Sequence, residues 1–171
     1  MKAKDIAYPS LFAALTAVGA QIAIPLGTVP ITLQVLFVLL SGFILGSHLG
    51  FLSQLIYLLM GSLGLPVFAN LSGGFAYIYG PTGGYLIAFP LAAFLVGFLS
   101  ERQETFLNYT LAMLLGILVI YLLGWFRLGI FMGGDFKKAF IVGVVPFVII
   151  DLIKGGIAII VAKRVKQAVT I

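Results

Sequence analysis

Residues 144–161 read Val144-Val-Pro-Phe-Val-Ile-Ile-Asp151-Leu-Ile-Lys154-Gly-Gly-Ile-Ala-Ile-Ile-Val161. Apart from one acidic and one basic residue the stretch is apolar, and its length approaches the roughly 20 residues that cross a bilayer as a helix. The three-residue spacing of Asp151 and Lys154 puts both on one helix face. Charges in a spanning helix normally face the bundle interior and mark a substrate or ion path. The segment therefore predicts a membrane helix that carries a candidate binding site.

The composition of the whole chain predicts the same setting. Of its 171 residues, 62% are hydrophobic and 9% are charged, which lies far outside the range of soluble globular proteins. We expect an all-α integral membrane protein, in contact with the lipid bilayer and folded as a single domain over residues 1–171. The sequence contains no cysteine, so disulfides and thiolate chemistry are excluded.

Six apolar runs predict a compact bundle of six transmembrane helices. They cover residues 8–24, 31–45, 49–63, 85–99, 107–125 and 144–162. The second and third runs are short for straight spanning helices, so we expect them to lie shallow or to be extended by the apolar residues that flank them.

The basic residues predict the orientation of this bundle. Six fall on one side of the membrane: Lys2, Lys4, Arg102, Lys163, Arg164 and Lys166. The other side has three in one loop: Arg127, Lys137 and Lys138. Because basic loops stay in the cytoplasm, both termini are expected to be cytoplasmic. No basic patch with interleaved aromatic residues supports a nucleic-acid partner.

The loop between the third and fourth runs is unusual. Residues 64–85 contain no charged residue. They contain six glycines and two prolines, which prevent one continuous helix. Irregular backbone at membrane depth is tolerated where it is buried in protein or lines a cavity. We therefore expect irregular outer loops, this one above all, to cap a ligand pocket.

Two features of this loop are candidate ligand contacts. The amide of Asn70 can donate and accept hydrogen bonds at once, although a turn or cap role is an alternative. Gly83 and Gly84, at the start of the fourth helix, can present backbone N–H groups to a ligand carboxylate. A plain turn from loop to helix is an equally good reading of these glycines.

Five blocks of sequence, in order and spread nearly from end to end, together resemble the BioY family. They are Pro30-Ile-Thr-Leu-Gln34, Gly64-Leu-Pro-Val-Phe-Ala69, Ser72-Gly-Gly74, Gly80-Pro-Thr-Gly-Gly-Tyr-Leu86 and Asp151-Leu-Ile-Lys154. Members of that family are the biotin-specific substrate-binding (S) components of energy-coupling factor (ECF) vitamin transporters.

The resemblance implies a multi-pass protein of a prokaryotic cell membrane that captures biotin from outside. It implies a transmembrane T subunit and two cytoplasmic ATPases as partners. The chain has no G-x-x-x-x-G-K-[ST] motif, so ATP is expected to be used only by those partners. No cofactor or metal is expected, since biotin is the transported ligand.

The resemblance also implies roles for the candidate site residues. Biotin's ureido ring has two N–H donors and one carbonyl, so Asp151 can accept from an N–H while Lys154 donates to the oxygen. Asn70 can complete these contacts. Apolar walls are expected from Tyr85 and from two further aromatic residues, Phe68 and Tyr79. The alternative is that Asp151 and Lys154 only neutralise each other as a buried pair.

Small residues on the first helix are the expected docking site for the T subunit. Ala13 and Ala17 stand four positions apart, and such spacing allows helices to pack closely in membranes. The same spacing serves packing within the bundle equally well.

An intramembrane enzyme needs several acids, bases or metal ligands at one depth. The chain offers one Asp and one Lys there, which is too few, so we do not expect an enzyme. A solitary biotin facilitator and an S component for another vitamin, such as thiamine or riboflavin, remain as alternatives. Tyr121 and Trp125 are interpreted as residues of the outer membrane interface, with stacking on a ligand as the alternative.

Overall fold

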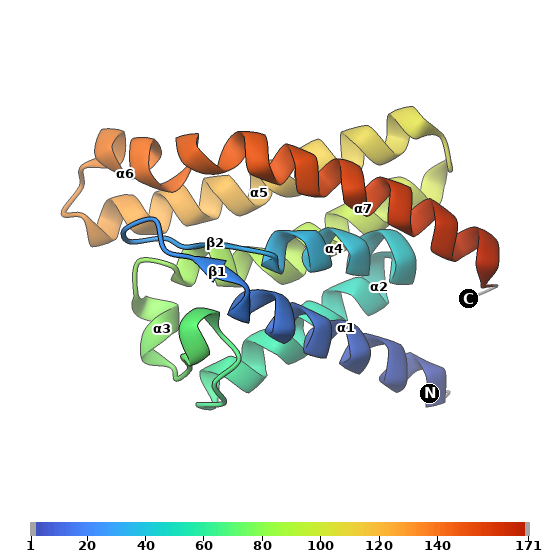
Figure 1. The fold of residues 1–171 in the computed structure, drawn as a ribbon, viewed down its shortest axis with the longest axis horizontal. Helices are drawn as coiled ribbons and strands as arrows, with labels where there is room; N and C mark the ends of the chain where they lie inside the picture. Colours follow the sequence, from blue (N-terminus) through green and yellow to red (C-terminus); the bar gives the residue numbers. More distant parts are fainter. Residues whose placement is uncertain (1–2, 170–171) are drawn as a thin grey trace.

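The computed structural model describes residues 3–169 as a mostly helical molecule with one small β-ribbon (Figure 1). Its elements are α1 (Ala3–Gln21), β1 (Ala23–Ile24), β2 (Ile31–Thr32), α2 (Gln34–Ser62), the 3-10 helix η1 (Ala69–Leu71), α3 (Ala76–Tyr79), α4 (Gly83–Arg102), α5 (Phe106–Phe131), α6 (Phe136–Gly143), the 3-10 helix η2 (Val145–Phe147) and α7 (Val148–Ala168). Lys2, which contributes to the predicted orientation, lies outside the described residues.

The helical prediction is confirmed, and the β-ribbon is the exception to it. β1 and β2 pair antiparallel, with Ala23 opposite Thr32 and Ile24 opposite Ile31. The strands bring the intervening residues back over the bundle as a hairpin. Its tip includes Val29, which is 7% exposed and belongs to the core.

The molecule has two distinct ends (Figure 1). The start of α1, the turn from α4 to α5 and the end of α7 lie at one end. The β-ribbon, α3 and α6 lie at the other end. We call the first the terminal end and the second the ribbon end. The predicted loop over residues 64–85 is therefore at the ribbon end, together with the predicted loop that carries Lys137 and Lys138.

A break at Gly46 divides α2 into two helical halves. Gly46 has φ +82° and ψ −173°, a backbone conformation that residues with a Cβ rarely adopt. A Cβ added at Gly50 would lie 3.0 Å from the Cα of Gly42, whereas residues eight apart in a straight helix are separated by roughly 12 Å. The chain therefore reverses at Gly46, between the two predicted runs 31–45 and 49–63.

A carboxylate from α4 caps the second half of α2. Glu101 accepts a hydrogen bond from the Ser47 backbone N–H at 3.0 Å and another from the Ser47 hydroxyl at 3.0 Å. Negative charge at a helix N-terminus is stabilising because the first N–H groups have no partner within the helix. The cap fixes the reversal of α2 against the end of α4.

The chain is a membrane protein. Within residues 3–169, four helical segments have the length and hydropathy needed to cross a bilayer: Gln34–Ser62, Gly83–Arg102, Phe106–Phe131 and Phe136–Ala168. The first of them contains the reversal at Gly46, and the last comprises α6, η2 and α7. Several leucines of α5 are at least 40% exposed, namely Leu111, Leu114, Leu115, Leu118 and Leu122. An apolar stripe of this kind is unfavourable in water and suits contact with lipid. The number of six crossings stays a prediction.

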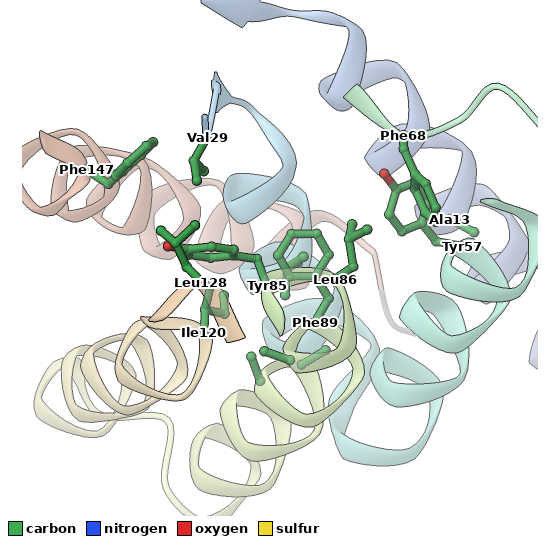
Figure 2. Close-up of a cluster of buried hydrophobic side chains, with 14 of the residues drawn as sticks. Ala13, Val29, Tyr57, Phe68, Tyr85, Leu86, Phe89, Ile120, Leu128 and Phe147 are labelled. Atoms are coloured by element: carbon green, nitrogen blue, oxygen red, sulfur yellow. The ribbon is translucent and has the colours of Figure 1, made fainter. Parts of the chain in front are cut away.

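Two hydrophobic clusters fill the bundle. One contains Tyr57, Phe68, Tyr85 and Phe89 (Figure 2). The other contains Phe43 stacked on Tyr109, with ring centroids 5.0 Å apart. The first cluster includes residues of the hairpin tip and of the loop at the ribbon end, so the core continues up to the candidate site.

The contact between α4 and the reversal of α2 yields a stability prediction. A Cβ on Gly97 would collide with the backbone of Gly46 and Ser47, so Gly97→Ala should destabilise the protein by about 1–3 kcal/mol. The matched control is Gly156→Ala on α7, where a Cβ would meet nothing within 4 Å. Thermal unfolding in detergent should show a lower midpoint for Gly97→Ala alone. Equal midpoints for the two variants would contradict this packing.

Candidate substrate-binding site

A cavity of about 210 Å³ lies between the β-ribbon, the loop at the ribbon end and helices α2, α4, α5 and α7. This is somewhat smaller than the roughly 300–1,000 Å³ typical of small-molecule pockets. Its lining comprises Thr28, Val29, Pro30, Thr32, Gln34, Val35, Phe68, Ala69, Asn70, Ser72, Tyr77, Pro81, Thr82, Tyr85, Leu86, Phe89, Ile120, Tyr121, Phe147, Asp151 and Lys154. A mostly apolar wall with a few polar groups is the pattern of a site for a small organic molecule.

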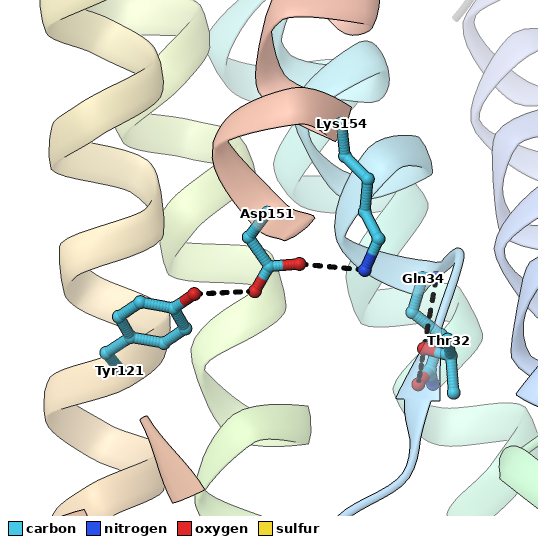
Figure 3. A network of polar contacts seen from close by, with 5 residues as sticks. All are labelled: Thr32, Gln34, Tyr121, Asp151 and Lys154. Carbon is cyan, nitrogen blue, oxygen red and sulfur yellow. Dashed lines mark hydrogen bonds and ion pairs between the residues drawn. The ribbon is translucent and has the colours of Figure 1, made fainter. Parts of the chain in front are cut away.

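The predicted charged pair lies in the wall of this cavity (Figure 3). Lys154 Nζ donates to Asp151 Oδ1 at 2.8 Å. Asp151 is 2% exposed and Lys154 is 6% exposed. Each charge alone would be strongly unfavourable at this depth, and mutual pairing offsets much of that desolvation cost.

Tyr121 is a member of this site that the sequence analysis missed. Its hydroxyl donates to Asp151 Oδ2 at 2.7 Å, so both carboxylate oxygens are hydrogen-bonded (Figure 3). Its place in the cavity lining favours a role in the site over a purely interfacial one. The available signal was that a phenol hydroxyl in an apolar helix needs a partner when it is buried.

Asp151 lies in the first turn of α7, which begins at Val148. Pro146 belongs to the separate 3-10 helix η2 (Val145–Phe147), which precedes α7. In the first turn of α7 the Asp151 carboxylate also benefits from the positive end of the helix dipole.

A second polar network enters the cavity from the start of α2. The Thr32 hydroxyl donates to Gln34 Oε1 at 2.8 Å, and Gln34 Nε2 donates to the Tyr57 hydroxyl at 2.7 Å. The Tyr57 hydroxyl in turn donates to the Val67 carbonyl at 3.0 Å. This chain of hydrogen bonds connects the cavity with the loop that covers it.

Asn70 lines the cavity, as the sequence suggested, and is exposed. Its backbone is left-handed, with φ 61° and ψ 38°. Asparagine tolerates this conformation better than most residues. The turn role and the ligand role are therefore compatible, and contact with a ligand stays a prediction.

The structure gives Gly83 and Gly84 a packing role. A Cβ on Gly83 would collide with the backbone of Ile78, and one on Gly84 with the backbone of Leu123. Neither glycine lines the cavity, although Tyr85 beside them does. The predicted contact of their N–H groups with substrate is not needed to explain these glycines and stays a prediction.

The aromatic walls agree with the sequence in part. Phe68 and Tyr85 line the cavity, whereas Tyr79 does not and is 62% exposed. The Tyr85 hydroxyl donates to the Gly143 carbonyl at 2.7 Å. This bond fixes the orientation of the Tyr85 ring, which forms an apolar wall. Its hydroxyl donor is engaged by Gly143 and is not available to a ligand.

The two alanines predicted to dock a partner differ in how far they are buried. Ala13 is 1% exposed and packs in the core near Tyr57 and Phe68 (Figure 2). Ala17 is half-buried, and Ala14 is exposed. Ala13 therefore serves packing within the bundle in this structure, and the docking role of the pair stays a prediction.

The site can bind a small molecule that both donates and accepts hydrogen bonds. A carboxylate can accept about four hydrogen bonds and an ammonium can donate three. Within residues 3–169, Asp151 accepts two hydrogen bonds and Lys154 donates one. No cluster of His, Cys, Asp or Glu suited to a metal occurs in that same part of the chain. The fold and site thus define a membrane protein with a small-molecule pocket at one end.

Comparisons with known proteins identify the family. The family model described as the BioY family matches residues 1–171. A probable biotin transporter BioY of Pyrococcus horikoshii is 54% identical over 166 residues, covering 97% of this chain and 98% of that protein. The biotin transporter BioY of Thermotoga maritima is 50% identical over 157 residues, covering 92% of each.

A solved structure agrees with the fold. The crystal structure of the S-component for biotin from an ECF-type ABC transporter has a TM-score of 0.89 and 27% identity, covering 98% of this chain and 95% of that one. The chain belongs to the BioY family. The resemblance inferred from the sequence is therefore confirmed, and with it the expectation that the chain is a transporter component and not an enzyme.

The charged pair should show strong energetic coupling. Lys154→Met leaves the Asp151 carboxylate buried without its counter-charge, which should cost about 3–5 kcal/mol of unfolding free energy. The double variant Asp151→Asn/Lys154→Met removes both charges and should be more stable than Lys154→Met alone. Unfolding curves in detergent for the parent, Asp151→Asn, Lys154→Met and the double variant complete a double-mutant cycle. If the double variant loses as much unfolding free energy as the two single variants together, the pair is uncoupled.

Proposed function

We propose that this chain is the biotin-binding S component of an ECF-type vitamin transporter, and that it captures biotin from outside the cell. The observation that carries the proposal is the ion pair of Asp151 and Lys154 in the cavity wall, in a chain that belongs to the BioY family. The relatives from Pyrococcus horikoshii and Thermotoga maritima, which are named as biotin transporters, support the same ligand.

The pair is chemically suited to a cyclic urea. One ureido N–H donates to the Asp151 carboxylate, and Lys154 donates to the ureido oxygen. Tyr121 holds the carboxylate from the other side through its 2.7 Å hydrogen bond. We propose that the second ureido N–H donates to the side-chain oxygen of Asn70, which lines the same cavity.

The rest of the cavity suits the apolar parts of biotin. Phe68, Tyr85, Leu86 and Phe89 provide apolar surface in the lining, against which the thiophane ring and the valeryl chain bury their carbon atoms. The backbone N–H groups of Gly83 and Gly84, at the N-terminus of α4, remain the proposed donors to the biotin carboxylate. Neither residue lines the cavity in this structure, and the Gly83 N–H donates to the Gly80 carbonyl at 3.3 Å, so this contact requires a rearrangement when biotin binds.

Transport requires other chains. We infer that a transmembrane T subunit docks on α1, near Ala17, and that two ATPases supply the energy, so that ATP is used only by these partners. The likeness of this chain to an S-component of an ECF-type ABC transporter supports this assembly. The chain itself needs no cofactor in this mechanism.

We further propose a topology of six crossings in a prokaryotic cell membrane, within a single domain over residues 1–171. The crossings are α1, the two halves of α2, α4, α5 and α7. The concentration of basic residues at the terminal end supports cytoplasmic termini, because Lys4, Arg102, Lys163 and Lys166 all belong to that end.

Equilibrium binding of labelled biotin to the purified chain tests the ligand. Asp151→Asn and the double variant Asp151→Asn/Lys154→Met should each weaken binding by about 10- to 150-fold, since hydrogen bonds to charged groups contribute roughly 1.5–3 kcal/mol. Glu104→Gln and Lys4→Met, at the opposite end of the molecule, are matched controls and should bind as the parent does.

Two results would contradict the proposal. Affinity equal to that of the parent in both site variants would remove the pair from the site. Displacement of biotin by thiamine or riboflavin at similar concentrations would favour an S component of different specificity. Binding should depend on the ureido ring, so an analogue alkylated at both ureido nitrogens should not compete.

Labelling of single cysteines tests the topology, because the chain has no native cysteine. In intact cells a membrane-impermeant maleimide should react with Lys138→Cys and should not react with Arg164→Cys. The second variant should react only after the membrane is permeabilised. The reverse pattern would place the termini outside.

A further inference from the structure

The residues that cover the cavity at the ribbon end form a tight loop. We call Val67–Ser72 the cap segment; four of its residues, Phe68, Ala69, Asn70 and Ser72, line the cavity. Its two ends are joined by a hydrogen bond from the Phe68 N–H to the Ser72 carbonyl at 2.9 Å. The segment is therefore a closed loop, with Asn70 near its tip.

The inner side of the cap segment is anchored to α2. The Tyr57 hydroxyl donates to the Val67 carbonyl at 3.0 Å. The Phe68 ring is 2% exposed and packs edge-on against the Tyr57 ring, with centroids 5.7 Å apart. These contacts fix Val67 and Phe68 at the beginning of the segment. They do not involve the residues at its tip.

The tip is held by Gln21, the last residue of α1. Gln21 Nε2 donates to the Phe68 carbonyl at 3.0 Å, and Gln21 Oε1 accepts from the Leu71 N–H at 2.9 Å. The same Nε2 donates to the Ala17 carbonyl of its own helix at 3.2 Å. One exposed amide thus ties the cap segment to the end of α1 at two points.

The backbone held in this way is in an uncommon conformation. Leu71 has φ 55°, next to Asn70 with φ 61°. Positive φ is rare for leucine because its Cβ is crowded in the left-handed region. The Leu71 side chain is 69% exposed, so burial does not hold the residue in place. Within the segment, the Ser72 hydroxyl donates to the Ala69 carbonyl at 2.6 Å and helps to close the turn. The bond from the Leu71 N–H to Gln21 is the contact that holds this turn from outside the segment.

We propose that Gln21 is a positioning residue that latches the cap segment over the cavity and sets the rate at which ligand enters and leaves. The inference rests on the proposed function, in which the cavity binds biotin. Gln21 is not in the cavity lining and acts only through the segment. Because the amide is also bonded to α1, a displacement of that helix relative to the bundle is transmitted to the cap segment.

The test is the dissociation rate of labelled biotin from the full chain, chased with excess unlabelled biotin. Gln21→Leu removes both hydrogen bonds and should release biotin about ten-fold faster, the order expected when two neutral hydrogen bonds are lost. Gln21→Glu keeps the acceptor for the Leu71 N–H, loses the donor to Phe68, and should fall between. Gln103→Leu, an exposed glutamine at the terminal end, is the matched control.

A latch and a merely structural residue predict different results. Loss of a latch accelerates both association and dissociation of biotin. The dissociation constant therefore changes less than either rate constant. The thermal midpoint should stay close to that of the control. A Gln21→Leu dissociation rate within about two-fold of the control would overturn the inference. The inference would also be overturned if a smaller fraction of the Gln21→Leu protein bound biotin but the bound biotin dissociated at the parent rate. A parent chain that binds no biotin would instead overturn the proposed function, and this inference with it.

Discussion

An ammonium and a carboxylate 2.8 Å apart, in a wall that is otherwise largely apolar, are the constraint around which this molecule is organised. Neither charge is tolerable there without the other. Their position at the start of α7 brings the carboxylate to the positive end of a helix dipole and within reach of the Tyr121 hydroxyl. The pair is thus held in a fixed orientation with donor and acceptor capacity that faces the cavity.

The surrounding fold brings distant segments to this pair. Tyr121 comes from α5, Gln34 from the start of α2, and the cap segment from the loop between α2 and α3. Close contacts between backbones make this convergence possible. Gly97 against the reversal of α2 and Gly84 against α5 are two examples in which any side chain would hold the helices apart. The cavity remains where the β-ribbon and the cap segment meet the ends of these helices.

Sequence reasoning succeeded where the signal is local. Apolar length and the three-residue spacing of Asp151 and Lys154 predicted the helices and the pair, because both depend only on neighbours along the chain. Tyr121 and Gln34 were not assigned to the site, since their partners are set by how each helix is rotated in the bundle. Gly83 and Gly84 were ambiguous because close packing and backbone contact with a ligand favour the same residue. The two-residue strands carry too little periodicity to be detected.

The most direct measurement is an experimental structure of the chain with biotin bound. We expect the ureido ring to lie in the cavity, with an N–H at hydrogen-bonding distance from Asp151 and the carbonyl oxygen at hydrogen-bonding distance from Lys154. Biotin bound elsewhere, with the ion pair unchanged and not in contact with it, would contradict the central claim.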